Sequence, residues 1–251
     1  SNAQGVRERM QIERGVTWAT AHADALLVAT GATLLAAYVF AMIAFPRADG
    51  RVVIGDATHH FVQLRSMVFD RDLHFQNDYT RIYRLAGGER DTEWVTDDLT
   101  KKGYVRNYMP VGPALLWAPL YLLVVGLQSA LALLGVAPPP DGFDRLSQLA
   151  PGVTGILGAT LAAWISWRLA ARSTSRANAL VATLAIWIGT NVVYYSLVSP
   201  AYSHAASMLT SALFLSVWLG QRSEVSIGRA ALWGGLAGAC ALMRWQGALF
   251  G

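Results

Sequence analysis

The chain has 251 residues, of which 54% are hydrophobic and only 14% are charged, and it contains nine tryptophans. This composition is typical of an integral membrane protein and excludes an ordinary water-soluble globular domain. The formal net charge of +4 comes from arginines that flank apolar segments, so it indicates no nucleic-acid partner. The single cysteine, Cys240, excludes an intrachain disulfide and a cysteine metal cluster.

The first 23 residues contain no apolar span. They open with Ser-Asn-Ala, which is typical of an expression-tag scar, and carry Arg7, Arg9 and Arg14. Basic residues beside a first span favour the cytoplasmic side of a membrane. Residues 1–23 are therefore predicted to be the tag scar and a cytoplasmic N-terminus, and residues 24–251 to form one transmembrane domain.

Membrane-crossing helices need about 20 apolar residues, and several runs reach that length. Four of them are 25–45, 146–167, 178–197 and 203–220. A fifth begins near Ala230, has Arg244 embedded in it and is still apolar at Gly251, so we expect the domain to be incomplete at its C-terminus. The runs predict an all-α, polytopic membrane protein.

The segment 107–137 is long enough to span but is rich in proline and glycine near its start. If it does not span, the arginine-rich stretches "RLAARSTSR" and "QRSEVSIGR" lie in the cytoplasm, and the uncharged turn "SPAYSH" lies outside. We therefore predict interfacial helices in 107–137, within one long extracytoplasmic loop over 46–145. A spanning 107–137, which reverses the later loops, is the alternative.

The stretch "IGDATHHFVQLRSMVFD", residues 54–70, follows the first span. One helical face collects Phe61, Leu64, Val68 and Phe69. This spacing predicts a short amphipathic helix on the membrane surface that starts at Asp56. The Asp56 carboxylate would lie at the positively polarised helix N-terminus, with His60 one turn later on the same side. A role for Asp56 as a simple helix cap is the alternative.

The chain resembles a known family in the order of its motifs: "GDATHHFVQLRSMVFDRDLHFQNDY", "YMPVGPALLWAPLYLL", "TNVVYYSLVSPAYSHAASMLTSALF" and "LMRWQGALF". It resembles bacterial membrane glycosyltransferases of the GT-C superfamily, which are similar to protein mannosyltransferases and lipid A aminoarabinose transferases. The resemblance implies a GT-C-like helical bundle whose first outer loop carries a catalytic Asp, matched by Asp56. It also implies that "NYMPVGPALLW" lies near a lipid phosphate. Relatives carry a Lys before these prolines, whereas the nearest cation here is Arg106.

The activity implied is transfer of a sugar from a polyprenyl-phosphate-linked donor to an extracytoplasmic acceptor, which would be a cell-envelope glycan, a lipid or a protein. The site would face the outside of the bacterial inner membrane. The acceptor hydroxyl must lose a proton as it attacks, and Asp56 is the expected general base. The departing phosphate gains charge that cations stabilise. Inversion in one displacement requires no covalent intermediate.

Seven further residues are predicted to bind substrate: His60, Arg65, Arg106, Tyr108, Tyr202, His204 and Arg244. The three arginines are candidates for the donor phosphate. Arg244 is singled out because a charge within an apolar run is costly unless it faces a cavity or a partner, although an arginine that snorkels to the interface is the alternative. Tyr202 and His204 open the span 203–220 where relatives often have polar site groups; capping by Ser203 is the simpler interpretation.

No residues are assigned as metal ligands. Adjacent histidines at 59 and 60 point about 100° apart on a helix, which disfavours a zinc site. Asp70, Asp72 and Asp78 could help to hold Mg²⁺ or Mn²⁺ with Asp56, but a solvated turn is the preferred interpretation of these carboxylates. The charged stretch "GGERDTEWVTDDLTKKGYVRN" is predicted to be a water-facing loop.

Two other functions fit a polytopic chain. A transporter of lipid-linked glycans would also place polar groups within the membrane, but its two halves should be similar and carry broken helices, and no such symmetry is visible. A non-catalytic scaffold for glycan assembly would keep the same fold without turnover.

Overall fold

The computed structural model describes residues 17–84, 92–220 and 226–250. Within these ranges every regular element is helical, and Leu99 and Val105 form an isolated β-bridge. The helices are α2 (Ala23–Ala44), α3 (Asp56–Arg65), α4 (Gln76–Arg84), α5 (Glu93–Thr96), α6 (Gly112–Leu133), α7 (Arg145–Ala170), α8 (Arg176–Gly189), α9 (Ser203–Trp218) and α10 (Ile227–Met243). Short helical turns η1 (Ser66–Asp70), η2 (Tyr194–Val198) and η3 (Trp245–Phe250) complete them. The all-α prediction is confirmed.

Three of these helices, α2, α6 and α7, are long and apolar enough to cross a membrane. The 22 residues of α2 and of α6 extend about 33 Å at 1.5 Å per residue, close to the thickness of a bilayer core. The predicted spans 25–45 and 146–167 correspond to α2 and α7. The predicted span 203–220 corresponds to α9, which is shorter at 16 residues.

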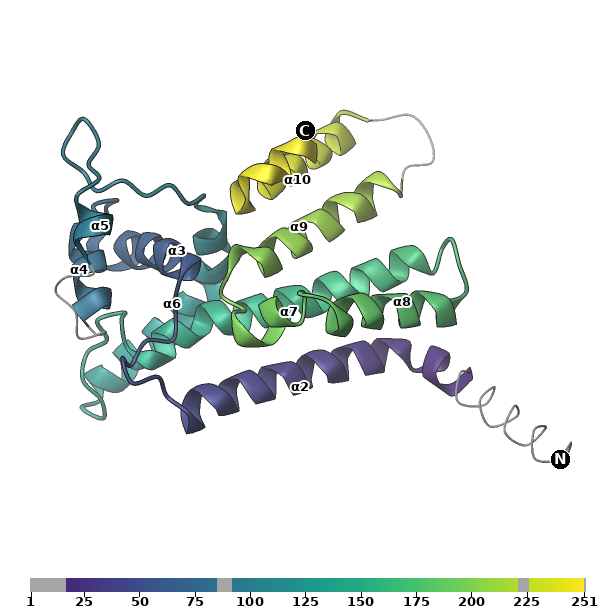
Figure 1. Cartoon of the computed structure of the whole chain (residues 1–251), viewed down its shortest axis with the longest axis horizontal. Helices are drawn as coiled ribbons and strands as arrows, with labels where there is room; N and C mark the ends of the chain where they lie inside the picture. The colour runs from purple at the N-terminus through teal and green to yellow at the C-terminus, as the bar shows by residue number, and fades with distance from the viewer. Residues whose placement is uncertain (1–16, 85–91, 221–225, 251) are drawn as a thin grey trace, which may run out of the picture.

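The helix at the centre of the bundle is α7 (Figure 1). Helices α2, α6, α8 and α9 pack against it, and α10 packs against α9. Glycines of α7 permit close approach: a Cβ at Gly152 would collide with the Tyr38 hydroxyl of α2, and a Cβ at Gly155 with the carbonyl oxygen of Pro200. Small residues at such contacts are typical of helix packing in membranes.

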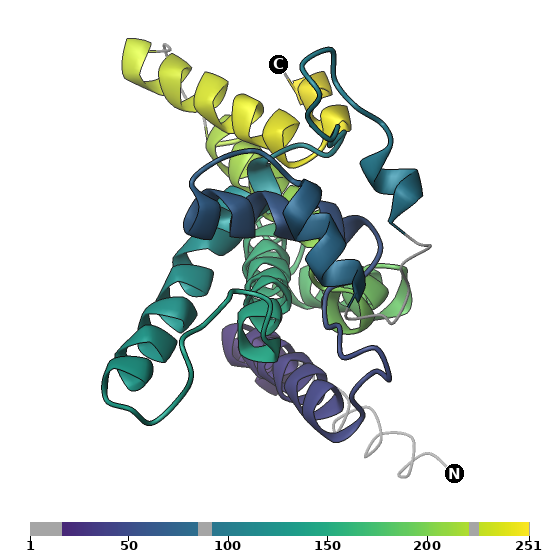
Figure 2. The same cartoon turned by 90° about the vertical axis from the view of Figure 1, so that its left-hand side faces the viewer.

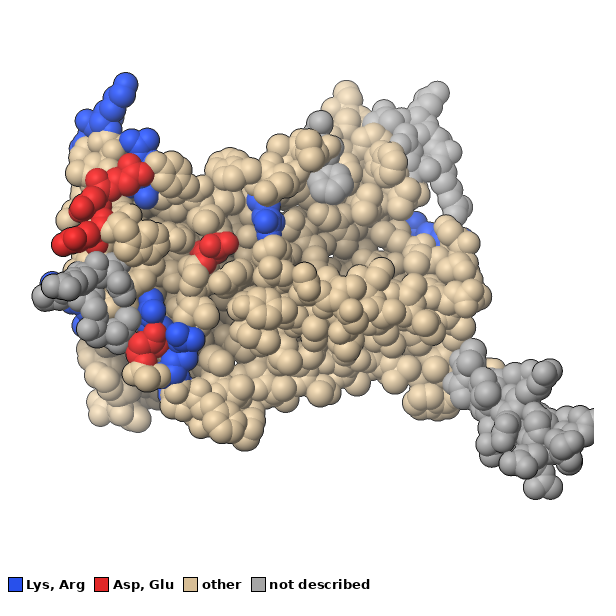
Figure 3. Space-filling model, viewed as in Figure 1, with Lys and Arg blue, Asp and Glu red and all other residues tan. Residues whose placement is uncertain are grey.

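The two ends of the bundle differ. The start of α2, the α7–α8 turn and the end of α9 lie at one end, and α3, α4 and α5 lie at the other (Figure 1). Charged side chains crowd the α4–α5 end of the face seen in Figure 3, whereas the surface over the long helices carries few. Figure 2 looks onto the charged end and shows α3 lying across the bundle, with α7 seen nearly along its axis.

The segment 107–137 forms the single helix α6 rather than several interfacial helices, so the predicted number is wrong. Pro113 lies in the first turn of α6, where a missing N–H costs nothing, and Pro119 lies inside the helix without ending it. Figure 2 shows α6 running out sideways from the bundle, strongly inclined to α7. Placement of α6 in the membrane interface stays a prediction.

The predicted span 178–197 is also interrupted. Helix α8 ends at Gly189, Thr190 is extended, and the Thr190 hydroxyl donates to the carbonyl of Ile186 at 2.6 Å. The chain turns and resumes as η2, which is held to α8 by a 3.1 Å hydrogen bond from the Trp187 indole to the Ser196 hydroxyl. Continuous apolarity predicted one helix here, but glycine and a β-branched residue end it.

The last apolar run breaks before Arg244, so the prediction that Arg244 is embedded in a helix is wrong. Helix α10 begins at Ile227 and ends at Met243, and Arg244 is extended at φ −153° and ψ 140°. The 3₁₀ turn η3 then packs against α10, where Gly247 lies directly on the Cys240 carbonyl. Arg244 therefore lies outside α10, at the corner between this helix and η3.

Helix α3 is not the amphipathic surface helix that was predicted. It ends at Arg65 rather than continuing to Phe69, and the turn η1 follows. Both its apolar and its polar sides are enclosed: Phe61 and Leu64 are buried, and so are Thr58 and His60. Helix α6 covers one side through edge-on ring contacts such as Phe61 with Tyr121. The segment 105–111 covers another by hydrogen bonds described below.

The separation of the two ends predicts a labelling pattern. In a Cys240→Ser background, we expect an impermeant thiol reagent added to intact cells to label Asp97→Cys and not Ser173→Cys. Both positions are exposed, and the arginine-rich loop that contains Ser173 should remain in the cytoplasm. Labelling of both sites would overturn the topology.

Candidate functional site

The start of α3 presents a free carboxylate. Gly55, at φ 53°, turns the chain into α3, so Asp56 is the first helical residue, as predicted. The Tyr202 hydroxyl packs directly on Gly55. The Asp56 side chain is exposed and makes no hydrogen bond or ion pair with a described residue, so no helix-capping bond from it is present there. Its negative charge lies at the favoured end of the helix.

Two residues lie near the Asp56 carboxylate: His204, in the first turn of α9, and Arg244, at the corner between α10 and η3. The Arg244 Nη1 donates to the His204 Nδ1 at 2.8 Å. Since a guanidinium has only donors, this ring nitrogen is the acceptor. The His204 ring stacks on Tyr195 with centroids 3.7 Å apart and planes 9° apart. These contacts fix the His204 plane and hold Arg244 at the N-terminal end of α9.

His60 is fully buried below Asp56. Its Nδ1 donates to the Pro110 carbonyl at 3.0 Å, and its Nε2 has no hydrogen-bond partner among the described residues. Burial lowers the pKa of His60 to about 4; the charge of Asp56 opposes this shift and that of Arg244 adds to it. Near neutral pH His60 is therefore uncharged.

A cavity of about 610 Å³ opens beside the Arg244–His204 pair. This volume is within the range of pockets that enclose small ligands. Its wall includes five polar side chains that make no hydrogen bond to a described residue: Ser166, Asn191, Ser207, Ser211 and Gln246. The remaining wall is mainly apolar, with Met208 and Leu215 of α9. The cavity can therefore hold a ligand that has both hydroxyl groups and apolar parts.

Five predicted residues thus gather in one place. Asp56 acts electrostatically on His60, Tyr202 and His204, and Arg244 acts on His60 and His204. We call Asp56, His60, Tyr202, His204 and Arg244 the α3–α9 cluster. Tyr195, whose ring orders His204, was missed by the sequence analysis, although it lies in the quoted motif "TNVVYYSLVSP".

Arg65 lies outside the α3–α9 cluster. It is mostly buried and bridges two carboxylates: Nη1 contacts Asp70 and lies 3.1 Å from Asp78 Oδ1. The guanidinium also covers the rings of Phe69 and Phe143, with centroids 5.1 and 4.8 Å away. Through these contacts, the Arg65 side chain joins α3 to η1 and α4.

Asp78 corrects the prediction of a solvated turn. It is fully buried in α4, and burial raises the pKa of its carboxyl to about 7 although Arg65 acts in the opposite direction. One carboxylate oxygen, Oδ2, has no hydrogen-bond partner among the described residues. Nothing in the alternation of charged residues over 70–78 distinguishes this aspartate from the half-buried Asp70 or the exposed Asp72.

Arg106 and Tyr108 form a separate group with Asp98. The Arg106 Nε lies 3.2 Å from Asp98 Oδ1, and the Tyr108 hydroxyl donates to Asp98 Oδ2 at 2.5 Å. Asp98 holds this phenol in its protonated form, so the pKa of Tyr108 is raised. The Trp245 indole donates to the Tyr108 carbonyl at 3.3 Å, which connects the segment 105–111 to η3 beside Arg244.

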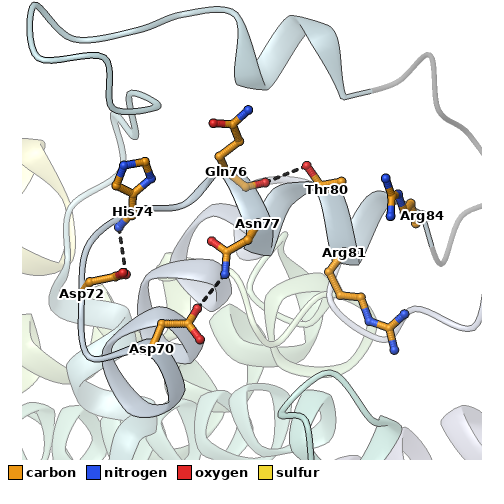
Figure 4. A pocket seen from close by; sticks show the side chains of 8 residues that line it. All are labelled: Asp70, Asp72, His74, Gln76, Asn77, Thr80, Arg81 and Arg84. Carbon is orange, nitrogen blue, oxygen red and sulfur yellow. Dashed lines mark hydrogen bonds between the residues drawn. The ribbon is translucent and has the colours of Figure 1, made fainter.

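A larger groove of about 680 Å³ lies on the outer side of α4 (Figure 4). Its polar groups mostly bond to one another: Asn77 donates to Asp70 at 2.8 Å, and the backbone N–H of His74 donates to Asp72 at 3.1 Å. Among the described residues no group of three histidine, cysteine or acidic side chains is placed to hold a metal ion. Residues 87–91 of the predicted charged loop lie outside the described ranges, as do residues 1–16 of the predicted N-terminal segment.

No protein-family model, curated protein or solved structure matches this chain. The geometry of the α3–α9 cluster and its cavity is therefore what indicates a function.

The contact between Gly55 and Tyr202 predicts a difference between two glycine substitutions. Gly55→Ala and Gly103→Ala both place a side chain at positive φ, but only the Cβ at position 55 meets another group. We expect Gly55→Ala to destabilise the protein by about 1–3 kcal/mol more than Gly103→Ala, because overpacking adds to backbone strain. Thermal unfolding of the purified variants measures this, and equal losses would contradict the packing of Tyr202 on α3.

Proposed function

We propose that the protein is an integral membrane glycosyltransferase, which transfers a sugar from a polyprenyl-phosphate-linked donor to an acceptor outside the bacterial inner membrane. The observation that carries the proposal is the Asp56 carboxylate, which has no partner among the described residues, near the Arg244–His204 pair that lines a cavity between apolar helices. In a displacement reaction, the anionic Asp56 would accept the proton of the attacking hydroxyl group. The cationic Arg244 would stabilise the negative charge on the leaving phosphate.

A lipid-linked donor fits the position of the cavity. Its tail would lie among the apolar helices, and its phosphate and sugar would lie near the outer ends of α9 and α10. Arg244 would bind the phosphate and stabilise the negative charge that grows as the sugar departs. The unpaired hydroxyl and amide groups of Ser207, Ser211 and Gln246 would bond sugar hydroxyls.

Asp56 would take the proton of the attacking acceptor hydroxyl. The C–O bond to the anomeric carbon would form as the bond to the donor phosphate breaks, and the polyprenyl phosphate would leave with the bonding electrons. One displacement inverts the anomeric configuration and needs no covalent bond to the protein. Tyr202 would support the site by fixing the entry to α3 through its packing on Gly55.

Transport of a lipid-linked glycan is the second candidate function. It is favoured by the ends of α8 and α10, since both helices stop at breaks whose residues Asn191 and Arg244 line the cavity. Broken helices at a binding site are typical of transporters. Transport requires ligand movement without chemical change, so a new glycosidic product distinguishes the two.

Arg244 provides the test of donor binding. Arg244→Met should weaken binding of a polyprenyl phosphate by about tenfold or more, because it removes charge-assisted hydrogen bonds, while thermal stability falls little. Arg244→Lys, which keeps the charge, should bind with intermediate affinity. Parallel loss of folding and binding in Arg244→Met would show a packing role instead.

Asp56 provides the test of catalysis. Asp56→Asn preserves shape but removes the basic oxygen, so sugar transfer should fall by about 10²–10⁴-fold with donor binding retained. A cap-only role predicts an almost silent change, since Asn caps helices as well as Asp.

The matched control for Asp56→Asn is Asp97→Asn, which removes another exposed carboxylate without a described partner. Transfer from a polyprenyl-phosphate donor by the purified protein is the measurement. Near-normal transfer by Asp56→Asn, or an equal loss in Asp97→Asn, would reject Asp56 as the base.

A further inference from the structure

A third, smaller pocket of about 210 Å³ lies next to α3, on the side of the segment 105–111. Its lining includes six residues with polar, aromatic or sulfur-containing side chains: His59, Trp94, Asp98, Arg106, Tyr108 and Met109. Its volume is below the range of pockets that enclose drug-sized ligands, so it suits a single ring rather than a chain of rings.

Two aromatic side chains flank this pocket and remain accessible. Trp94 is 63% exposed and Tyr108 is 64% exposed. Trp94 is nevertheless held in place, because its indole meets the rings of His59 and Tyr83 edge-on at 6.2 and 6.1 Å. A fixed but uncovered indole offers a flat apolar face at low entropic cost to a ligand.

Fixed polar groups lie beside these rings. The Asp98 carboxylate is oriented by Arg106 and Tyr108, as described above, and Arg106 Nη2 also donates to the Leu99 carbonyl at 2.8 Å. The His59 Nδ1 is 2.7 Å from the Tyr79 hydroxyl, while its Nε2 makes no hydrogen bond to a described residue. The pocket therefore combines an aromatic face with preorganised donors and acceptors.

We infer that this pocket binds one uncharged pyranose ring of the acceptor. A pyranose has an apolar C–H face and a rim of hydroxyl groups, which match the Trp94 face and the Asp98, Arg106 and His59 groups. His59 and Asp56 are three residues apart on α3, so they lie on the same side of the helix. A sugar held beside His59 would therefore lie on the side of α3 that carries the Asp56 carboxylate.

This inference rests on the proposed glycosyl transfer for its biological meaning, but sugar binding is measured independently of turnover. An alternative is that Trp94 belongs to an aromatic belt at the membrane surface. A belt tryptophan contacts lipid headgroups and needs no oriented carboxylate, whereas Asp98 and Arg106 form a paired, fixed rim at this pocket.

The test uses methyl pyranosides of glucose, mannose and galactose as probes and the 251-residue chain in lipid nanodiscs. Saturation-transfer difference NMR should show saturable binding of at least one probe. Trp94→Leu should weaken that binding by about tenfold, the scale of one lost aromatic contact. Trp94→Phe, which keeps an aromatic face, should retain most of it.

Two further variants separate this inference from the proposed function. Trp218→Leu removes a half-exposed indole at the far end of α9 and should leave sugar binding unchanged. Asp56→Asn should bind the probe normally even where transfer is lost. Absence of saturable binding by the unsubstituted protein, or equal binding by Trp94→Leu, would overturn the pocket assignment.

Discussion

The burial of α3, a helix in which Thr58, His60 and Gln63 are enclosed together with the apolar residues, is the constraint on which the rest of the site depends. A buried polar group without a partner costs free energy, so the polar groups of α3 favour contact with other polar groups. The segment 105–111 supplies several such contacts: His60 bonds the Pro110 carbonyl, Gln63 bonds the Met109 carbonyl at 2.8 Å, and Asn107 bonds the His59 carbonyl at 2.9 Å. Thr58 Oγ1, His60 Nε2 and Gln63 Oε1 have no hydrogen-bond partner among the described residues.

These hydrogen bonds position both halves of the site. The segment 105–111 carries Arg106 and Tyr108 into the small pocket, and its Tyr108 carbonyl accepts from Trp245 of η3, beside Arg244. On the other side, Tyr202 packs on Gly55 at the entry to α3. Asp56 acts electrostatically on His204, which lines the proposed donor cavity, and it lies three residues before His59, which lines the proposed acceptor pocket, so α3 connects it to both.

The sequence predicted individual site residues better than it predicted how these residues lie relative to one another. An acid before a helical stretch was enough to place Asp56 at the start of α3, and a charge within an apolar run marked Arg244. Hydropathy carries no information on where a helix breaks, so the ends of α8 at Gly189 and of α10 at Met243 were missed. Those breaks are what place Asn191 and Arg244 at the cavity.

The roles of charged residues in the outer segment were harder to predict. Arg65, Asp70 and Asp78 have the same local pattern as solvated charges, and their pairing depends on how η1 turns the chain between α3 and α4. Similarly, α3 has the spacing of a surface helix, but α6 and the segment 105–111 close over it. Tertiary contacts between distant segments decide such cases, and one sequence does not reveal them.

The most direct test of the central claim is a cryo-EM map of the full-length protein in lipid nanodiscs with polyprenyl phosphate bound. The proposed transfer predicts phosphate density within hydrogen-bond distance of Arg244 and beside Asp56, with the lipid tail leaving along the apolar helices. Phosphate density confined to another basic surface, such as Arg81 and Arg84 on the α4 groove, with the Arg244–His204 pair unchanged, would contradict it.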